Sequence, residues 1–399
     1  MANALNLVGK RVHFIGLGGV SMSALARLLE INDKAIISGS DANVLGHSAK
    51  NISREIDLVI INGAISDDNP ELLKAQQLNI PILTRAELLA YIESKYINKI
   101  AVAGSHGKST TTAMIGAVLA AGGLNPTVHN GAMPNLLVGG KGYFVTEACE
   151  FKRSFLLLKP TVGVITNIDI DHMDCYNNLE EIQEAFNSFA SNSKVVLRCD
   201  ELCKEVSDIE EYSRGKYSFK LLDTTIKLGV VGRHNIHNAC AAAHVGLHFG
   251  IDIKVIATAL ENFSGISRRF EFMRKLGECD LITDYAHHPV ELETTISTAN
   301  DLYGEDNYLI VFQPHTYTRT IALFDDFIRV LKGANSVLYK TFSAREKPKK
   351  GGSARDLALA SGKKYFHEKQ LLSNYIDNIS KNYRAIILTG AGDVNTVIS

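Results

Sequence analysis

Residues 98–121 constrain the fold of this 399-residue chain more than any other stretch. A short apolar run of β-strand composition ends in a segment rich in glycine and serine, and an apolar helical pattern follows at once. This order directs backbone N–H groups and the positive end of a helix at one point, which is the arrangement that binds phosphate. Gly107-Lys108-Ser109 is present, but Val102 stands where the common P-loop pattern has its first glycine. The stretch therefore predicts an α/β unit with a compressed phosphate loop.

The compressed loop keeps the functional groups that bind a nucleotide triphosphate. Gly104 is the nearest upstream glycine, and Lys108 has the length to reach terminal phosphates as a point charge. The hydroxyl of Ser109 or Thr110 is a suitable ligand for Mg²⁺. The alternative interpretation is a glycine-rich helix start that binds nothing.

Apolar runs of strand length alternate with helical patterns along the whole chain, which predicts α/β architecture with largely parallel sheets. A chain of this length exceeds one ordinary core. We expect three domains, at residues 1–97, 98–264 and 265–399. The first and third are predicted to be Rossmann-like, and the central one a P-loop ATPase-like domain with a mostly parallel sheet. Residues 200–228 are polar and match neither periodicity.

Bulk composition excludes several classes of protein. The 42 basic and 43 acidic residues give a net charge of −1, so no general attraction to nucleic acid is expected. The sequence has no run of 18 apolar residues and no apolar segment of signal-peptide type at its start, which predicts neither a membrane protein nor a secreted one. Six cysteines without a Cys-x-x-Cys pair fit a reduced, cytoplasmic protein.

A second glycine cluster, Gly16-x-Gly18-x-x-Ser21, separates a strand pattern from a helix pattern near the N-terminus. Glycine there permits close approach of a pyrophosphate to the backbone, and Asp41 follows the next strand, where a ribose hydroxyl is held in dinucleotide-binding folds. The pattern carries Ser in place of its third glycine. A nucleotide diphosphate, NAD, or a tight turn without a ligand all remain open at this point.

Acidic residues follow two further strand patterns. Glu147 and Glu150 come after residues 143–149, and the segment 169-DIDHMDCY-176, which contains His172, comes after residues 161–168. The carboxyl ends of parallel strands share one edge of a sheet with the phosphate loop. A carboxylate and an imidazole there are candidates to hold Mg²⁺, and a solvated acidic loop is the alternative.

Four polar clusters lie beside apolar runs in the second half of the chain. A histidine or arginine in any one of them is more often structural than catalytic. Asn235 and Asn238 are spaced to face one side of a helical turn, where paired amides could meet the edge of a base. The clusters are 232-GRHNIHN-238, 268-RRFE-271, 284-DYAHHP-289 and 315-HTYTR-319.

Taken together and in order, these motifs resemble those of the Mur ligase family, ATP-dependent enzymes that form amide bonds in peptidoglycan assembly. The resemblance covers essentially the whole chain. Its N-terminal part is most similar to the branch that adds L-alanine to UDP-N-acetylmuramate. The motifs are GSHGKSTTTAM, EACEFKRSFL, TNIDIDHMD, GRHNIHNA, RRFE, DYAHHP and FQPHTYTRT, with HFIGLGGVSMSALA, SGSD and AISDDNPE for the N-terminal part.

The resemblance implies that the first domain holds the UDP-sugar, the second binds ATP, and the third brings the amino acid. It implies Mg²⁺ at Ser109, Glu147 and His172, and chemistry at Lys108, His172, His288 and Arg319. Arg319 and His288 are similar to positions near the incoming amino acid. The implied ATP contacts are Gly104, Ser105, His106, Gly107, Lys108, Ser109, Thr110, Asn235, Asn238, Arg269 and Asp284. The implied UDP-sugar contacts are Gly16, Gly18, Gly19, Ser40, Asp41 and Ser66.

Two departures from family patterns bear on the substrate and on activity. Relatives that add later residues use a carbamylated lysine, whereas the predicted helix 179–192 contains no lysine, which fits the alanine-adding branch. The 200–228 region is shorter than in many relatives. A tripeptide-recycling ligase, an NAD-dependent oxidoreductase and an inactive nucleotide-binding scaffold stay open as alternatives.

Overall fold

The computed structural model describes residues 6–41, 46–170, 175–344 and 346–398, and its chain divides into two compact units. The first unit comprises Met1–Asp169, Leu179–Leu202 and Ala241–Ile256. The second comprises Ile170–Asn178, Cys203–Cys240 and Ala257–Ser399. Among the described residues, no helix combines the length and the hydropathy that crossing a bilayer requires.

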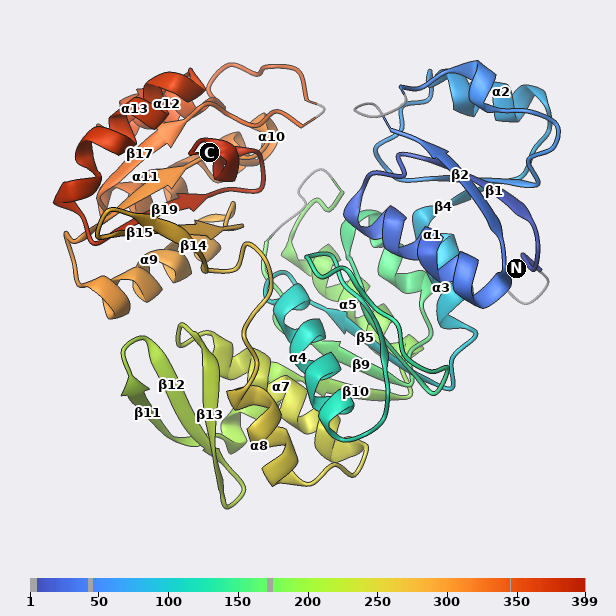
Figure 1. Ribbon diagram of the computed structural model, residues 1–399, viewed down its shortest axis with the longest axis horizontal. Helices are drawn as coiled ribbons and strands as arrows, with labels where there is room; N and C mark the ends of the chain where they lie inside the picture. The colour runs from blue at the N-terminus through green and yellow to red at the C-terminus, as the bar shows by residue number, and fades with distance from the viewer. Residues whose placement is uncertain (1–5, 42–45, 171–174, 345, 399) are drawn as a thin grey trace. The chain divides into compact units, whose positions relative to one another are not determined.

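The first unit begins with a four-stranded parallel sheet in the order β2-β1-β3-β4 (Figure 1). Local sequence explains where two of its helices start. Asn69 accepts hydrogen bonds from the N–H groups of Glu71 and Leu72 ahead of a helix that opens with proline, and Thr84 forms a capping box with Glu87. The strands are β1 (Arg11–Ile15), β2 (Ile36–Ser40), β3 (Leu58–Ile61) and β4 (Ile82–Thr84), and the helices are α1 (Val20–Asp33), α2 (Pro70–Gln77) and α3 (Arg85–Glu93).

The same unit contains a six-stranded sheet in the order β10-β9-β5-β8-β6-β7, parallel except for the short final strand. All four residues of β9 are buried, as expected for a strand covered on both faces. Helix α4 packs closely on the sheet, since a Cβ at Gly116 would lie 2.7 Å from Val128 Cγ2. The strands are β5 (Asn98–Ala103), β6 (Thr127–His129), β7 (Leu136–Leu137), β8 (Tyr143–Glu147), β9 (Val162–Ile165) and β10 (Val195–Arg198), and the helices are α4 (Lys108–Ala121), α5 (Leu179–Asn192) and α6 (Cys199–Leu202).

Residues 200–228, which show neither a helical nor a strand periodicity in the sequence, lead into an antiparallel three-stranded sheet in the second unit. Its strands are β11 (Ser207–Ser213), β12 (Lys216–Leu221) and β13 (Thr224–Val231). The Tyr217 hydroxyl of β12 donates a hydrogen bond to Asp301 Oδ2, 2.6 Å away in helix α9 (Pro289–Tyr303). Two helices, α7 (Asn235–His248) and α8 (Ile253–Glu261), follow, and each contributes residues to both units.

The C-terminal sheet of the second unit has the order β14-β15-β19-β16-β17-β18, and only its edge strand β14 runs antiparallel. Every residue of the central strands β16 and β19 is buried. Its strands are β14 (Glu271–Leu276), β15 (Cys279–Asp284), β16 (Tyr308–Phe312), β17 (Ser336–Tyr339), β18 (Lys364–Phe366) and β19 (Ala385–Thr389), with helices α9 (Pro289–Tyr303), α10 (Tyr317–Ala322), α11 (Phe324–Lys332), α12 (Ala354–Ser361) and α13 (Lys369–Ile379).

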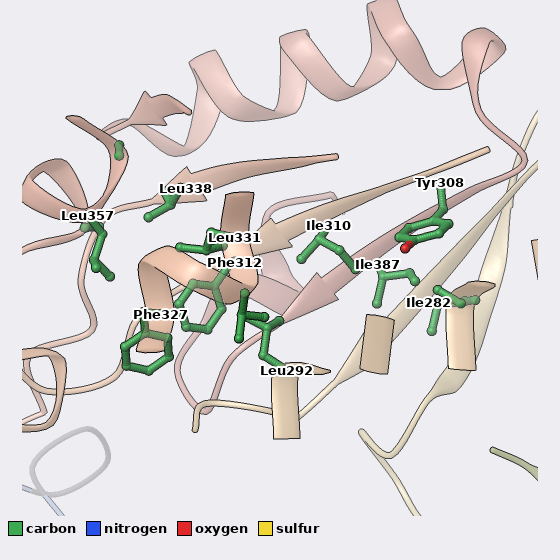
Figure 2. Close-up of a cluster of buried hydrophobic side chains, with 14 of the residues drawn as sticks. Ile282, Leu292, Tyr308, Ile310, Phe312, Phe327, Leu331, Leu338, Leu357 and Ile387 are labelled. Carbon is green, nitrogen blue, oxygen red and sulfur yellow. The ribbon is translucent and has the colours of Figure 1, made fainter. Parts of the chain in front are cut away.

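Alternate residues of these central strands form two separate cores. Ile310, Phe312 and Ile387 face helices α9, α11 and α12, where Phe327 and Leu331 meet them (Figure 2). Their neighbours along the strands belong to a second cluster with α13. A sheet with apolar cores on both faces is the layered arrangement that alternating α/β patterns predict, so the predicted fold class is confirmed.

Candidate active site

The loop between β5 and α4 has the backbone geometry of a phosphate-binding loop. Gly104 has φ +142° and Gly107 has φ +81°, values that favour glycine. A Cβ at Gly104 would lie 1.9 Å from Thr166 Oγ1, so no side chain fits there. Gly107 is the N-cap of α4 and supplies no side-chain cap, so the first N–H groups of the helix keep their capacity to bind an anion.

Residues after β9 hold this loop in place. Thr166 Oγ1 donates to the His106 carbonyl at 2.6 Å, and Asn167 Oδ1 accepts from the His106 N–H at 2.9 Å. The Ser105 hydroxyl lies 2.9 Å from the Asp169 N–H and 3.1 Å from the Asp169 carbonyl. Since β5 and β9 are parallel neighbours, the ends of the two strands supply one preformed cradle.

Lys108 lies at the centre of the loop. Its Nζ donates to the carbonyls of Gly104 and Ser105 and lies 3.1 Å from Glu150 Oε1. The Lys108 side chain is 15% exposed and that of Glu150 only 3%, so this ion pair is largely shielded from solvent. Burial lowers the pKa of Lys108, but the carboxylates of Glu150 and Glu147 outweigh it and the net pKa is raised. The lysine is therefore a fixed positive charge inside the loop.

The predicted Mg²⁺ ligands Ser109 and Glu147 lie near the same loop. Glu147 ends β8, beside Val102 of β5, and its Oε1 accepts a hydrogen bond of 2.6 Å from the Gly131 N–H. The buried Asn130 side chain donates to the Ser109 carbonyl at 3.1 Å. His172 lies outside the described residues. No group of three or more His, Cys, Asp or Glu side chains able to hold a metal occurs in the part of the chain that the structure describes.

A chain of polar contacts joins the N-terminal sheet to the loop's sheet. Ser21 Oγ, at the third position of the first glycine cluster, lies 2.9 Å from His129 Nε2 and accepts from Arg85 at 3.3 Å. The other ring nitrogen of His129 lies 2.9 Å from Thr146 Oγ1. Burial, with Arg85 nearby, lowers the pKa of His129 to about 3, so this histidine is neutral at physiological pH.

The first glycine cluster forms a tight turn at the ends of β1 and β2. The Gly16 N–H donates to the Ser40 carbonyl at 2.8 Å, and a Cβ at Gly18 would lie 2.9 Å from Asp41 Oδ2. Gly19 is the N-cap of α1 and, like Gly107, supplies no side-chain cap. The turn therefore brings four of the six predicted UDP-sugar residues beside Asp41 at one sheet edge. Ser66 is exposed in the turn before α2, where its carbonyl accepts from the Asn69 N–H.

The hydroxyl of Ser40 is hydrogen-bonded to the buried carboxylate of Glu71. It donates a hydrogen bond of 2.5 Å to Glu71 Oε2, and Glu71 is fully buried. His47 Nδ1 lies 3.2 Å from the same oxygen, and the Asn51 amide donates to the other oxygen. Burial raises the pKa of Glu71, but these hydrogen bonds outweigh it and hold the pKa below its ordinary value. Sequence reasoning did not single out Glu71, which organises the segment after β2.

In the second unit, Asn235 and Asn238 lie together at the start of α7, as predicted from their spacing. Both are buried, and the Asn238 amide donates to Asn235 Oδ1 at 2.9 Å. The Asn235 amide in turn donates to the Val231 carbonyl at 2.7 Å. The pair is therefore preorganised by its own hydrogen bonds.

Asp284, at the end of β15, is also buried and internally bonded. Its Oδ2 accepts from the Phe270 N–H at 2.7 Å, and its Oδ1 accepts from the Ala286 N–H at 2.8 Å. Burial raises the pKa of Asp284, although Arg269 and these N–H groups act in the opposite direction. Arg269 lies 3.9 Å from Glu291 and 5.3 Å from the centre of the Tyr285 ring. The two predicted nucleotide contacts Asp284 and Arg269 thus lie at one end of the same sheet.

His288 is the N-cap of α9. Its Nδ1 accepts from the Val290 N–H at 3.3 Å, and its Nε2 lies 3.2 Å from the Ile170 carbonyl, where it donates. The ring forms a capping box with Glu291. Both ring nitrogens of this candidate base are therefore engaged in structural contacts.

Arg319 lies in the first turn of α10. Its Nη1 lies 3.2 Å from His315 Nδ1, and the His315 ring stacks on Phe342 with centroids 5.7 Å apart. The His287 ring packs edge to face against the His315 ring, with centroids 5.6 Å apart. Arg319 thus lies against an imidazole that is itself held by Phe342 and His287.

The contact of Glu150 with Lys108 was not predicted from the sequence. The motif EACE places it three residues after Glu147, and both were recognised as acidic residues at a strand end. Its contact with Lys108 depends on β8 lying beside β5 in parallel register, which no local pattern reveals.

Three segments of the chain match domains of one family. Residues 11–96 match the Mur ligase family catalytic domain, residues 102–208 the Mur ligase middle domain, and residues 268–394 the Mur ligase glutamate ligase domain. A curated protein of Lachnospira eligens is 36% identical, with 97% of this chain and 96% of the relative covered. The chain therefore belongs to the Mur ligase family, and the resemblance inferred from the motifs is confirmed.

The relative from Lachnospira eligens is named UDP-N-acetylmuramate–L-alanine ligase. Its alignment spans 449 positions, more than this chain contains, so the relative has segments without a counterpart here. The crystal structure of the UDP-N-acetylmuramate-alanine ligase MurC from Thermotoga maritima is similar over 97% of both chains, with a TM-score of 0.81 and 27% identity. A murein peptide ligase from Psychrobacter arcticus shares the fold, with a TM-score of 0.73 at 20% identity over 98% of this chain and 97% of its own.

Proposed function

We propose that this protein is an ATP-dependent ligase that joins L-alanine to the lactyl carboxylate of UDP-N-acetylmuramate in peptidoglycan precursor synthesis. Relatives at 36% identity over nearly the full chain carry that activity in their names. The absence of lysine in α5 favours the alanine-adding branch. A cytoplasmic location is part of the proposal, and a sequence with six cysteines but no Cys-x-x-Cys pair fits it.

The observation that carries the proposal is the preformed loop around Lys108. A carboxylate does not react with an amine in water until it is activated, and transfer of a phosphoryl group is a direct means of activation. The glycine geometry, the uncapped start of α4 and the buried lysine provide donors for the charge that builds on a transferred phosphoryl group.

In the first step, a lactyl carboxylate oxygen attacks the γ-phosphorus of ATP, and the bond to the β-phosphate oxygen breaks. ADP leaves and an acyl phosphate forms. Lys108 lies in the loop as a fixed cation that offsets the developing charge. In the second step, the amine of L-alanine attacks the acyl carbon, inorganic phosphate leaves, and the amine loses a proton to a base. His172 and His288 are the candidate bases, and His288 acts only by releasing one of its two present contacts.

Mg²⁺ is proposed at Ser109, Glu147 and His172. A hydroxyl and a carboxylate suit this ion, which keeps several waters and uses few protein ligands together with substrate phosphates. When bound, it neutralises charge on the phosphates. The Gly131 N–H donates to one carboxylate oxygen of Glu147 and thereby fixes the orientation of the carboxylate.

The remaining roles are proposed on family resemblance and on the local geometry. Asn235 and Asn238 contact the adenine, and Arg269 and Asp284 the phosphate and ribose. Arg319 holds the carboxylate of L-alanine, for which a guanidinium is suited as a bidentate donor. The loop residues Gly104, Ser105, His106, Gly107, Lys108, Ser109 and Thr110 bind the ATP phosphates, and Gly16, Gly18, Gly19, Ser40, Asp41 and Ser66 bind the UDP-sugar.

Phosphate release with ATP and UDP-N-acetylmuramate tests the function. The amines compared are L-alanine, glycine, L-serine and the stem tripeptide. We expect turnover that depends on the sugar nucleotide and is fastest with L-alanine. Turnover with the tripeptide alone would assign the protein to muropeptide recycling, and ATP binding without turnover would indicate an inactive scaffold. Lys108→Ala should abolish turnover, and full activity in that variant would contradict the role of the loop.

A further inference from the structure

The short helix α10, which carries Arg319, is capped by a residue outside its own sequence. Its N-cap, Thr316, makes no side-chain hydrogen bond to the helix. Instead, Glu346 Oε2 accepts hydrogen bonds from the N–H groups of Tyr317 and Thr318, at 2.7 and 2.9 Å. One carboxylate from the loop after β17 therefore fixes the first turn of α10.

Further contacts hold this loop against the helix. Lys349 Nζ donates to Thr318 Oγ1 at 2.8 Å, and the Glu346 N–H donates to the Ser343 carbonyl at 2.9 Å. A Cβ at Gly352 would lie 2.7 Å from the Tyr317 carbonyl, so the loop backbone packs directly on α10. The loop after β17 thus packs against the start of α10 through three of its residues.

The backbone immediately before α10 is strained. Thr316 has φ +65° and ψ 145°, a conformation that is unfavourable for a β-branched residue. Its N–H donates to the Phe342 carbonyl at 2.9 Å, and its carbonyl accepts from the Thr320 hydroxyl at 2.7 Å. Strain of this kind persists only where the surroundings fix the backbone, and such residues cluster at functional sites.

Arg319 is the third residue of α10, so the orientation of this turn sets where its guanidinium leaves the helix. Burial raises the pKa of Glu346, but the hydroxyl and N–H of Thr318 and the N–H of Tyr317 outweigh it, and the net pKa lies below its ordinary value. Glu346 is therefore ionised at neutral pH and presents a full negative charge to the helix start, where it is most favourable.

We propose that Glu346 is a positioning residue for the amino-acid substrate: it fixes α10 and so aims Arg319 at the substrate carboxylate. The inference rests on the proposed function, in which Arg319 binds that carboxylate. Glu346 itself does not contact substrate in this account. Its effect should therefore be specific to the amino acid and should depend on Arg319.

The test compares Glu346→Gln with Asp356→Asn in steady-state kinetics. Asp356 is a matched control because its carboxylate caps the neighbouring helix α12 through the N–H and hydroxyl of Ser353, at 3.0 and 2.7 Å. We expect Glu346→Gln to raise KM for L-alanine about tenfold or more, with KM for ATP and for UDP-N-acetylmuramate within about twofold of wild type. Asp356→Asn should leave all three KM values unchanged.

A double-mutant cycle with Arg319→Ala separates this inference from the proposed function. If Arg319→Ala leaves KM for L-alanine unchanged, the assignment of Arg319 fails, and the inference with it. If Arg319→Ala raises that KM and Glu346→Gln does not, only the inference is overturned. The expected result is strong non-additivity, with little further effect of Glu346→Gln in the Arg319→Ala background.

Thr316→Gly is a second variant that leaves Glu346 in place. It loosens the same turn by giving the backbone before α10 more freedom, so it should also raise KM for L-alanine selectively. Equal rises in all three KM values with Glu346→Gln and with Thr316→Gly would show a general structural role and overturn the inference.

Discussion

The ion pair between Glu150 and Lys108 gives the sharpest prediction about the phosphate loop. Glu150→Gln keeps the size of the side chain but removes its charge, so the buried ammonium loses the carboxylate that it contacts and keeps only the more distant Glu147. The lysine retains the carbonyls of Gly104 and Ser105 as acceptors. We therefore expect the variant to fold with a weakened and less precisely oriented loop.

The magnitude follows from the burial of the pair. Removing one partner of a buried ion pair costs about 3–5 kcal/mol. The lower end applies here, about 3 kcal/mol, because Lys108 is 15% exposed and keeps two other acceptors. A displacement of the ammonium on the order of 1 Å should lower kcat by about 10²-fold. Denaturation by urea and the phosphate-release assay measure the two effects.

Two controls define what would refute this reasoning. Glu181→Gln removes the partner of Arg153 in a pair of 2.6 Å whose side chains are 42% and 26% exposed, so it should cost no more than about 1 kcal/mol and leave kcat unchanged. Lys108→Met combined with Glu150→Leu should recover stability but not activity. If Glu150→Gln matches Glu181→Gln in both stability and kcat, the ion pair has no role in orienting the lysine.

Three further predictions concern strain and titration in the first unit. Gly104→Ala should abolish ATP-dependent turnover and lower the free energy of unfolding by at least about 1–3 kcal/mol, because the new Cβ would lie 1.9 Å from Thr166 Oγ1. Gly123→Ala is the control, since a Cβ there meets open space, and it should leave turnover intact. Equal losses of turnover in the two variants would contradict this. The pKa of His129 is about 3 in the folded protein against 6.5 ordinarily, so stability should be full above pH 6.5 and fall by up to about 1.4 kcal/mol per pH unit between 6.5 and 3. In His129→Gln that slope should disappear from denaturation curves at pH 7 and 5, and an unchanged slope would refute the assignment. Burial raises the pKa of Glu93 above 4.5, so Glu93→Gln should gain stability relative to wild type as pH rises above 4.5; a constant difference across that range would count against it.

Local patterns predict the α/β fold and the loop but fail where an element depends on a distant partner. All seven residues of β11 are exposed, so the strand has no hydrophobic alternation and exists through pairing with β12. The apolar pattern over residues 318–331 predicts one continuous helix, but the structure divides it into α10 and α11 at Leu323, which has φ −115°. No glycine or proline marks the break. Contacts of α10 with the loop after β17 accompany it.

The same distinction applies to the candidate site. Gly104, Gly107 and Lys108 lie within five consecutive residues, and glycine beside a lysine at a helix start is a local signal. Glu150 and Glu346 act on residues 42 and 28 or 29 positions away, through strand register and loop packing. Their types and spacings resemble those of ordinary surface carboxylates. The fold is needed to identify them.

Transfer of oxygen-18 from the lactyl carboxylate tests the central claim most directly. The protein is incubated with ATP, L-alanine and UDP-N-acetylmuramate carrying ¹⁸O at both oxygens of that carboxylate, and the released inorganic phosphate is analysed by mass spectrometry. Activation through an acyl phosphate predicts one ¹⁸O in each phosphate released, together with one equivalent of the alanine adduct. Phosphate without ¹⁸O, formed at the same rate as the adduct, would contradict carboxylate activation at the Lys108 loop.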